Sequence, residues 1–338
     1  MTRMTYLEAA VQAIREEMRI DSRVFVMGED LQSGVWGDFG LEEFGPERVR
    51  NTPICEAGFF GAGVGAALTG MHPVIDNQCS TFLYSAMDQI VSQVAKSRYM
   101  FGGQSSVPLL IRATVMYGFS AAAHHSDRPW GLFAQVPGLT IVVPSTPYDV
   151  KGLIRSAIRS RNPVLCFEEL ALKGQEGEVP EEHYTVPIGL AEVKRAGCDL
   201  TIVALGASTH SSLAAASELE AEGLSAEVVD LRTVVPLDRR TILASVAKTG
   251  RLVVVDPAPG MCSVASEVAA SVAENAFEKL KGPIIRVTAP DLPVPFSPDL
   301  ERLLYPTPQT IAGAARKLFR DIRSGSVRRR SIAGSALE

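Results

Sequence analysis

Short apolar runs alternate with segments of helical periodicity along almost the whole chain, and this alternation constrains the fold more than any other feature. The segments between the runs repeat apolar residues at helical spacing, as at residues 82–100 and 149–159. Strands that are apolar on both sides and separated by helices are typical of a parallel sheet with both faces covered. The pattern therefore predicts the α/β class. The predicted strands are Val24–Met27, His72–Ile75, Val107–Ile111, Leu139–Val143, Pro163–Phe167, Leu200–Leu205, Ala226–Leu231, Leu252–Val255 and Ile284–Val287.

A polar stretch divides this alternation into two parts. Residues 171–197 are rich in Gly, Glu and Pro without a long periodic run, so we interpret them as a linker with an irregular connecting ribbon. The length of 338 residues suits two domains. We therefore expect two doubly wound domains, at residues 1–170 and 198–324, of which the second is smaller. Residues 325–338 are basic and Ser-rich without an apolar pattern, which predicts a flexible tail.

Composition and charge argue against several classes of partner. The formal net charge is -5 with acidic and basic residues interspersed, which gives no sign of a nucleic-acid surface. No apolar run approaches the roughly 18 residues that span a bilayer, and the N-terminus lacks a signal-peptide core. The five cysteines are scattered without C-x-x-C spacing, so they indicate neither zinc nor a disulfide framework. We therefore expect a cytoplasmic protein with no nucleic-acid or membrane partner.

A cluster of small residues occupies one face of a predicted helix over residues 57–69. Gly58, Gly61, Ala62 and Gly65 share this face, and neither a G-x-G-x-x-G loop after a strand nor a Walker-type loop occurs in the chain. Each glycine costs a helix up to about 1 kcal/mol, so the cluster requires a packing reason. It predicts either tight packing within the domain or a helix–helix seam between subunits.

The segment Pro53–Gly58, with the sequence P-I-C-E-A-G, resembles the P-I-S-E-x-G motif of beta subunits of the thiamine-diphosphate-dependent 2-oxo acid dehydrogenases, a transketolase-like family. The family includes components that act on pyruvate, branched-chain 2-oxo acids and acetoin. The resemblance implies an N-terminal pyrimidine-binding domain with a parallel sheet and a smaller α/β domain of the transketolase C-terminal type. Further matches lie in order at Phe44–Val49, Ala86–Ile90, Arg98–Gln104, His125–Ser126, Val136–Leu139, Pro144–Asp149, Asp230–Thr233 and Pro290–Ser297.

Glu56 is the central catalytic residue that this resemblance implies. Thiamine becomes a carbon nucleophile when its own aminopyrimidine, as the imino tautomer, removes the thiazolium proton. A carboxyl group that shares a proton with the pyrimidine ring nitrogen drives this tautomer. A carboxyl group with this role suits apolar surroundings, and Ile54, Ala57 and Phe59 flank Glu56. The local sequence alone also fits an acid at a helix N-terminus, where the helix dipole favours it.

Four further residues are assigned to the site by the same resemblance. Phe82 aligns with the aromatic residue that stacks on the pyrimidine, and Gln78 and Ile54 are expected to line the same pocket. His125 aligns with the active-site histidine, which polarises or protonates the substrate-derived oxygen or assists acyl transfer. Without the resemblance, Phe82 fits a core position and His125 fits a loop cap. His124 replaces the glutamine of the family, and a metal held by this His-His pair lacks a third ligand.

Bulkier residues at 116–120 replace the usual glycine-rich approach to the histidine, so the substrate is expected to differ from plain pyruvate. The family also binds a structural monovalent cation, usually K⁺, largely through backbone oxygens. The corresponding positions are Leu109, Ala157, Ile158, Ser160 and Asn162. The segment before Pro163 is also explained without a metal, as a capped helix end.

The chain has no G-D-G motif for the Mg²⁺ ion that carries the cofactor diphosphate, and Gly28-Glu29-Asp30 has the wrong order. The resemblance therefore implies an alpha-type partner that supplies this half of the site, in an α2β2 heterotetramer with thiamine diphosphate at the interface. The expected reaction decarboxylates a pyruvate-like 2-oxo acid and transfers the acyl or hydroxyalkyl unit.

A lipoyl-bearing acyltransferase is a second candidate partner, although residues 256–263 depart from the family pattern in the second domain. Two alternatives stay open. One is a free-standing decarboxylase and carboligase that forms an acyloin. The other is a non-catalytic partner that stabilises the alpha-type chain.

Overall fold

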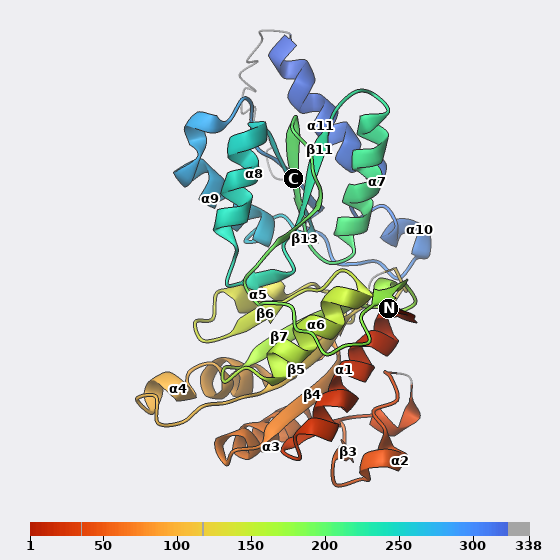
Figure 1. Ribbon diagram of the computed structural model, residues 1–338, viewed down its shortest axis with the longest axis vertical. Coiled ribbons are helices and arrows are strands. Elements are labelled where there is room, and N and C mark those ends of the chain that lie inside the picture. Colours follow the sequence, from red (N-terminus) through yellow and green to blue (C-terminus); the bar gives the residue numbers. More distant parts are fainter. Residues whose placement is uncertain (35, 117, 324–338) are drawn as a thin grey trace, which may run out of the picture.

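The computed structural model describes residues 1–34, 36–116 and 118–323. The predicted tail at 325–338 lies outside the described residues, as does Tyr117 in the predicted bulky approach to the histidines. Two lobes follow one another along the long axis, and each has a sheet flanked by helices (Figure 1). The predicted α/β class with two doubly wound units is therefore confirmed.

The first sheet has seven strands in the order β12-β6-β7-β5-β4-β2-β3. Every neighbouring pair is parallel except β12 with β6. The carboxyl ends of β7, β5, β4, β2 and β3 consequently meet at one edge, which is where α/β sheets bind their ligands. The strands are β2 (Val24–Gly28), β3 (Val49–Asn51), β4 (His72–Cys79), β5 (Leu110–Val115), β6 (Thr140–Val142), β7 (Val164–Glu169) and β12 (Thr233–Val235).

Helices cover both faces of this sheet, as the continuous apolar strands require. Successive strand residues point to opposite faces: Val74 packs in the core beneath α1 and α6, whereas Ile75 packs in the core beneath α3. The capping box between Thr5 and Glu8 starts α1, and Thr146 caps α6. The helices of this lobe are α1 (Tyr6–Ile20), η1 (Leu31–Ser33), α2 (Leu41–Phe44), α3 (Glu56–Leu68), α5 (Trp130–Ala134) and α6 (Pro147–Ile158).

One expectation for this lobe is wrong in detail, and one of two alternatives for another is not supported. The single helix expected over 82–100 is instead three short segments: the 3-10 helix η2 (Ser80–Ala86), the π-helix η3 (Gln89–Val94) and α4 (Ser97–Met100). The small-residue face of α3 is exposed, and a Cβ placed on Gly61 or Gly65 meets no described atom within 4 Å. Tight packing within the domain therefore does not explain that face.

The second lobe contains a five-stranded sheet in the order β14-β13-β10-β11-β9, parallel except for β9. Helices α7 and α11 cover one face, and α8 and α9 cover the other. The strands are β9 (Glu192–Arg195), β10 (Leu200–Ala204), β11 (Ala226–Asp230), β13 (Leu252–Pro259) and β14 (Ile285–Ala289). The helices are α7 (Ser208–Glu220), α8 (Arg239–Thr249), α9 (Val264–Asn275), η5 (Phe277–Lys279), α10 (Pro298–Glu301) and α11 (Pro308–Arg323).

The two lobes are joined by more than the stretch expected as a linker. Within it, η4 (Leu170–Leu172) is followed by β8 (Glu176–Val179), which pairs antiparallel with β1 (Thr2–Thr5), and β9 adds to the second sheet. Strand β12 lies between two strands of the second sheet in sequence but completes the edge of the first. One hydrophobic core also runs through both lobes, from Trp130 and Phe133 to Val264 and Val268. No helix in the described part of the chain is long and apolar enough to cross a membrane.

Candidate active site

Neighbouring strands of the first sheet bring the predicted site residues to one edge. Glu56 begins α3 shortly after β3, Gln78 lies near the end of β4, and Phe82 lies in η2 directly after it. His125 lies in the connection between β5 and α5. Residues that are far apart in sequence therefore meet because their parallel strands end at the same edge.

Glu56 interacts electrostatically with a second carboxyl group that sequence reasoning did not select. Glu29 follows β2, is only 4% exposed, and has a pKa that is raised by burial and then by the negative charge of Glu56. The side-chain amide of Gln78 donates to the Glu29 carbonyl oxygen at 2.8 Å. The signal for Glu29 was its position, an acid directly after the buried strand of residues 24–28.

Three buried oxygen atoms in the segments that follow β2 and β3 and at the end of β4 have no hydrogen-bond partner among the described residues. They are Oε2 of Glu29, Oδ1 of Asn77 and Oγ1 of Thr52. Buried polar atoms are normally satisfied by protein, water or a ligand. The ends of these strands therefore offer unpartnered polar atoms for a bound group.

Phe82 and His125 are in direct contact. Their rings meet edge to face with centroids 5.4 Å apart and planes at 73°. The backbone beside the histidine is held by the segment before Phe82, because the Cys79 thiol donates to the His125 carbonyl at 3.2 Å and the Thr81 hydroxyl donates to the His124 carbonyl. The His125 ring is half-buried and that of His124 is exposed, so the site is open on this side.

A buried ion group lies beneath the edge and fixes Gln78, whose φ of +52° is in the left-handed region. Its backbone amide donates to Asp76 at 3.1 Å, and Asp76 accepts from Arg112 at 2.7 Å. Arg112 also makes a bidentate pair with Glu168 at 2.6 and 3.0 Å. Burial raises the pKa of Asp76, and the arginine offsets part of this effect. The three charges tie β4, β5 and β7 together under the site.

The apolar pocket expected around Glu56 is only half present in this chain. Phe59 is buried, but Ile54 is 79% exposed and Cys55 and Ala57 are exposed as well. Glu56 itself is half-buried. The chain thus provides one wall of a pocket whose other side is open.

Four of the five predicted cation positions lie at the end of α6 and in the connection to β7, and the fifth, Leu109, lies directly before β5. The Leu109 carbonyl accepts the Val164 amide at 2.9 Å and that of Ala157 accepts the Ser160 amide at 3.1 Å. The Arg98 guanidinium donates to the Asn162 side chain at 2.5 Å. Among the described residues no group of three or more His, Cys, Asp or Glu side chains is arranged to hold a metal ion, so the His124–His125 pair gains no third ligand.

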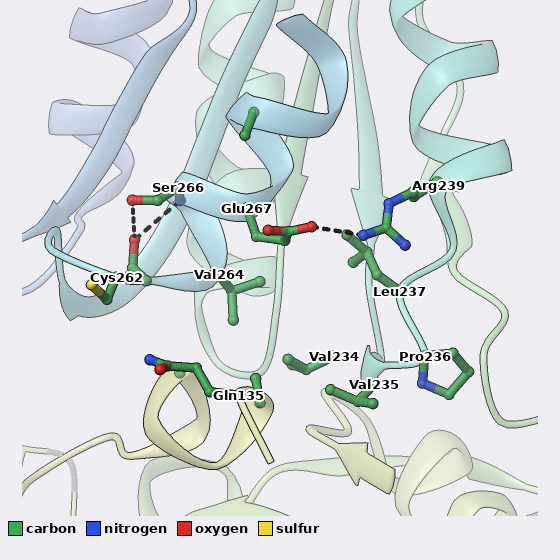
Figure 2. A pocket seen from close by; sticks show the side chains of 14 residues that line it. Gln135, Val234, Val235, Pro236, Leu237, Arg239, Cys262, Val264, Ser266 and Glu267 are labelled. Carbon is green, nitrogen blue, oxygen red and sulfur yellow. Dashed lines mark hydrogen bonds and ion pairs between the residues drawn. The ribbon is translucent and has the colours of Figure 1, made fainter. Parts of the chain in front are cut away.

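A cavity of about 680 Å³ lies elsewhere, between α5, the segment after β12 and α9 (Figure 2). Its walls are mainly apolar. Its two charged residues, Arg239 and Glu267, form an ion pair with each other at 2.7 Å. None of the predicted site residues lines it. A smaller cavity of about 320 Å³, lined by Tyr84, Asp127 and Arg128 among others, adjoins the histidine loop. The sheet edge stays the predicted site, because Glu29, Glu56 and His125 lie in segments that follow its parallel strands.

Comparison with known proteins agrees with this geometry. The model of the transketolase pyrimidine binding domain matches residues 2–172, and that of the transketolase C-terminal domain matches residues 189–311. The chain belongs to the transketolase family.

Relatives match this transketolase-family chain along nearly its whole length. The acetoin:2,6-dichlorophenolindophenol oxidoreductase subunit beta of Bacillus subtilis is 43% identical over 336 residues, covering 94% of this chain and 98% of that protein. The pyruvate dehydrogenase E1 component subunit beta of the same organism is 45% identical over 324 residues, covering 94% and 99%. The predicted resemblance to such beta subunits is confirmed.

A solved structure described as a split gene transketolase in an inactive beta4 tetramer superposes with a TM-score of 0.79. It is 24% identical and covers 94% of this chain and 98% of that one. The similarity confirms the fold of this transketolase-family member.

Proposed function

We propose that this chain is the beta subunit of a thiamine-diphosphate-dependent enzyme of the 2-oxo acid dehydrogenase type. It decarboxylates a pyruvate-like 2-oxo acid and passes on the acyl or hydroxyalkyl unit. The observation that carries the proposal is the meeting of Glu56, Phe82 and His125 at one sheet edge, with Phe82 and His125 in ring contact. The beta subunits that share more than two fifths of its sequence support the reaction class.

The residues present fit the pyrimidine half of the cofactor. Phe82 offers a half-exposed aromatic ring for a flat heterocycle, Gln78 and Ile54 border the same edge, and the unpartnered oxygens of Glu29 and Asn77 offer polar contacts. When bound, thiamine diphosphate supplies the carbon nucleophile that holds the electrons left by decarboxylation. Glu56 holds a proton at its carboxyl group and shares it with a ring nitrogen.

Glu29 influences this proton position electrostatically. Burial, and then Glu56, raise the pKa of Glu29, so its carboxyl group is more readily neutral beside Glu56 than in water. A neutral Glu29 adds no negative charge next to the carboxyl group that shares its proton with the ring nitrogen.

His125 handles the proton at the substrate oxygen. Its backbone carbonyl accepts from the Cys79 thiol, and its half-buried ring packs edge to face with the Phe82 ring. These two contacts limit the orientations of the imidazole. An imidazole donates or accepts a proton near neutral pH without a large cost. His124 is exposed beside it and forms the outer rim of the site, where its side chain limits the size of the substrate.

An alpha-type partner completes the site in an α2β2 assembly. The chain has no G-D-G motif, and hard oxygen ligands for Mg²⁺ and the diphosphate come from that partner. The exposed Ile54, Ala57 and small-residue face of α3 support such a covering chain beside Glu56. A lipoyl-bearing acyltransferase is the proposed acceptor of the acyl unit.

We also propose that a K⁺ ion binds backbone oxygens at the end of α6, in the α6–β7 connection and directly before β5. A carbonyl oxygen has two lone pairs, so a carbonyl that accepts one amide, as that of Leu109 does from Val164, can also bind a cation. Ala157 is a further position of the predicted set. The remaining positions are Ile158, Ser160 and Asn162. In a thermal-shift titration, K⁺ is expected to raise the thermal midpoint of the chain, whereas the same concentrations of Na⁺ are not.

The test uses this chain co-purified with an alpha-type partner, Mg²⁺ and thiamine diphosphate. Turnover is measured on a panel of 2-oxo acids and acetoin, and reduction of lipoyl domains is measured against formation of an acyloin. Replacing Glu56→Gln is expected to lower turnover by about 10²–10⁴-fold, the contribution of a general acid–base group, with the assembly intact.

Glu47→Gln is the matched control, because Glu47 is an exposed acid of the same region paired only with Arg50 in the described structure. Full turnover in the Glu56→Gln variant would refute the catalytic role and favour a non-catalytic partner. An acyloin product without lipoyl reduction would favour the carboligase.

A further inference from the structure

The second lobe reaches across to the loop that carries the two histidines. Glu301 ends the short helix α10 at the boundary between the lobes (Figure 1) and is only 1% exposed. One oxygen of its carboxylate accepts the Gly118 amide at 3.1 Å and the other accepts the Ser120 amide at 2.7 Å. A carboxylate that receives backbone amides in this way makes strong, charge-assisted hydrogen bonds. The approach to His124 and His125 is therefore held by a residue 181 positions beyond Ser120.

The backbone of this loop adopts conformations that need stabilising contacts. Ser120 and Ala122 adopt φ values of +53° and +61°, and neither is glycine. The left-handed region is unfavourable for a residue with a Cβ, so the surrounding contacts must maintain it. The turn ends with the His125 amide donating to the Ala122 carbonyl at 3.3 Å. The strained turn thus leads directly into the histidine.

The same segment of the second lobe holds the far side of the loop. The Tyr305 hydroxyl donates to Glu301 at 2.9 Å, and the Tyr305 ring lies 4.4 Å from the guanidinium carbon of Arg128. Arg128 also pairs with the buried Glu169 at 3.7 Å. Glu301 and Tyr305 therefore contact the loop both before and after the histidines, whereas residues 79–81 of the first lobe hold the histidine carbonyls.

We propose that Glu301 is a positioning residue for His125, through which the second lobe sets the geometry of the active-site loop. The proposal rests on the proposed role of His125. It gives the second lobe a part in the catalytic step besides any docking role. The physical reason is that a catalytic group misplaced by about 1 Å can lose on the order of a hundredfold in rate.

The experiment compares the wild-type complex with Glu301→Gln and with Asp299→Asn as the matched control. The glutamine keeps the size of the side chain but replaces one acceptor oxygen by a donor group, so one loop amide loses its partner. Asp299 is an acid of the same helix, is exposed and pairs with Arg302. Hydrogen exchange of the peptide that covers residues 118–125 is measured alongside turnover, KM and the affinity for thiamine diphosphate.

In Glu301→Gln, exchange in that peptide is expected to rise at least about tenfold and turnover to fall by about ten- to a hundredfold, the range for one lost hydrogen bond to a charged group. KM and cofactor affinity should stay within about twofold, and exchange in the strands of the second sheet should not change. Asp299→Asn should match the wild type in every measurement. A purely structural role would instead raise exchange throughout the second lobe.

Tyr305→Phe removes only the hydroxyl that donates to Glu301 and carries the test if the glutamine variant fails to fold. It should raise exchange in the same peptide about threefold. Unchanged exchange at residues 118–125 in the variants would overturn the proposal, as would a loss of turnover without faster exchange there. Absence of cofactor-dependent turnover in the wild-type complex would instead overturn the proposed function, and the exchange measurement would still decide the role of Glu301.

Discussion

Replacing Asp230→Asn should remove a pH dependence of stability that is built into the contact between the two lobes. Asp230 ends β11, is fully buried, and accepts the Ser145 hydroxyl of the first lobe at 2.5 Å. Burial, and after it the charge of Asp149, raise its pKa from 3.8 to about 7, and the Lys194 ammonium at 3.9 Å only partly offsets this. The Arg232 backbone amide also donates to it at 3.2 Å. Asp230 is therefore neutral in the folded chain at mildly acidic pH.

The sign of the effect follows from proton linkage. Between pH 3.8 and about 7 the folded chain keeps the Asp230 proton and the unfolded chain releases it. The stability contributed by this group is thus fully present below pH 3.8 and is lost as the pH rises through about 7. A shift of about three units, at about 1.4 kcal/mol each, corresponds to roughly 4 kcal/mol over the whole range. Between pH 5 and pH 8 the free energy of unfolding that Asp230 contributes falls by about 2–3 kcal/mol.

The assay is the thermal midpoint of the full chain at pH 5, 6, 7 and 8, for the wild type and for Asp230→Asn. At about 2 °C per kcal/mol, the difference between the two midpoints should change by roughly 5 °C in favour of the variant as the pH rises. Groups that do not interact with Asp230 are common to both proteins and cancel in the difference. Asp299→Asn, an exposed control, should show a constant difference.

A difference that moves in favour of the wild type with rising pH would refute this reasoning. That result would mean that Lys194 keeps Asp230 charged in the folded chain, with a pKa below 3.8. A difference that is flat between pH 5 and pH 8 would equally refute it, because it would mean that Asp230 is already ionised in the folded chain at pH 5, against the pKa of about 7 that burial imposes.

Two further pairs of variants test the packing around the site. Gly61→Ala should raise the stability of the isolated chain by up to about 1 kcal/mol, because alanine favours a helix and the position is open. Gly63→Ala should lower the stability, because a Cβ there would lie 2.6 Å from the Ile75 side chain. Opposite changes in thermal midpoint are expected, and equal changes would contradict the exposed face of α3. Arg112→Met should destabilise the chain by about 3–5 kcal/mol, because it leaves two buried carboxylates without their partner. The exposed Arg50→Met should cost less than about 1 kcal/mol in the same urea titration, and similar losses in both would show that the buried group is not held as described.

The parts of the fold that local patterns control were predictable. Apolar runs of strand length predicted most strands of the two sheets, because a strand buried on both faces must be apolar at every position. The helix over 57–69 was also predictable from its small-residue periodicity. The segment at 82–100 was not, because the same apolar spacing allows 3-10, α and π turns and the packing of η2 and η3 against α3 selects among them.

The sequence by itself determined the class of the chain and led to the prediction of Glu56 as its central acid, because the motif around Glu56 and the strand periodicity are local properties. Only the tertiary structure decided that Glu29 interacts electrostatically with Glu56, that β12 completes the first sheet, and that Glu301 holds the loop before His125. The physical reason is that such contacts join residues up to 183 positions apart. Their meeting depends on the order of strands in the sheets and on how the two lobes pack, which no short stretch of sequence specifies.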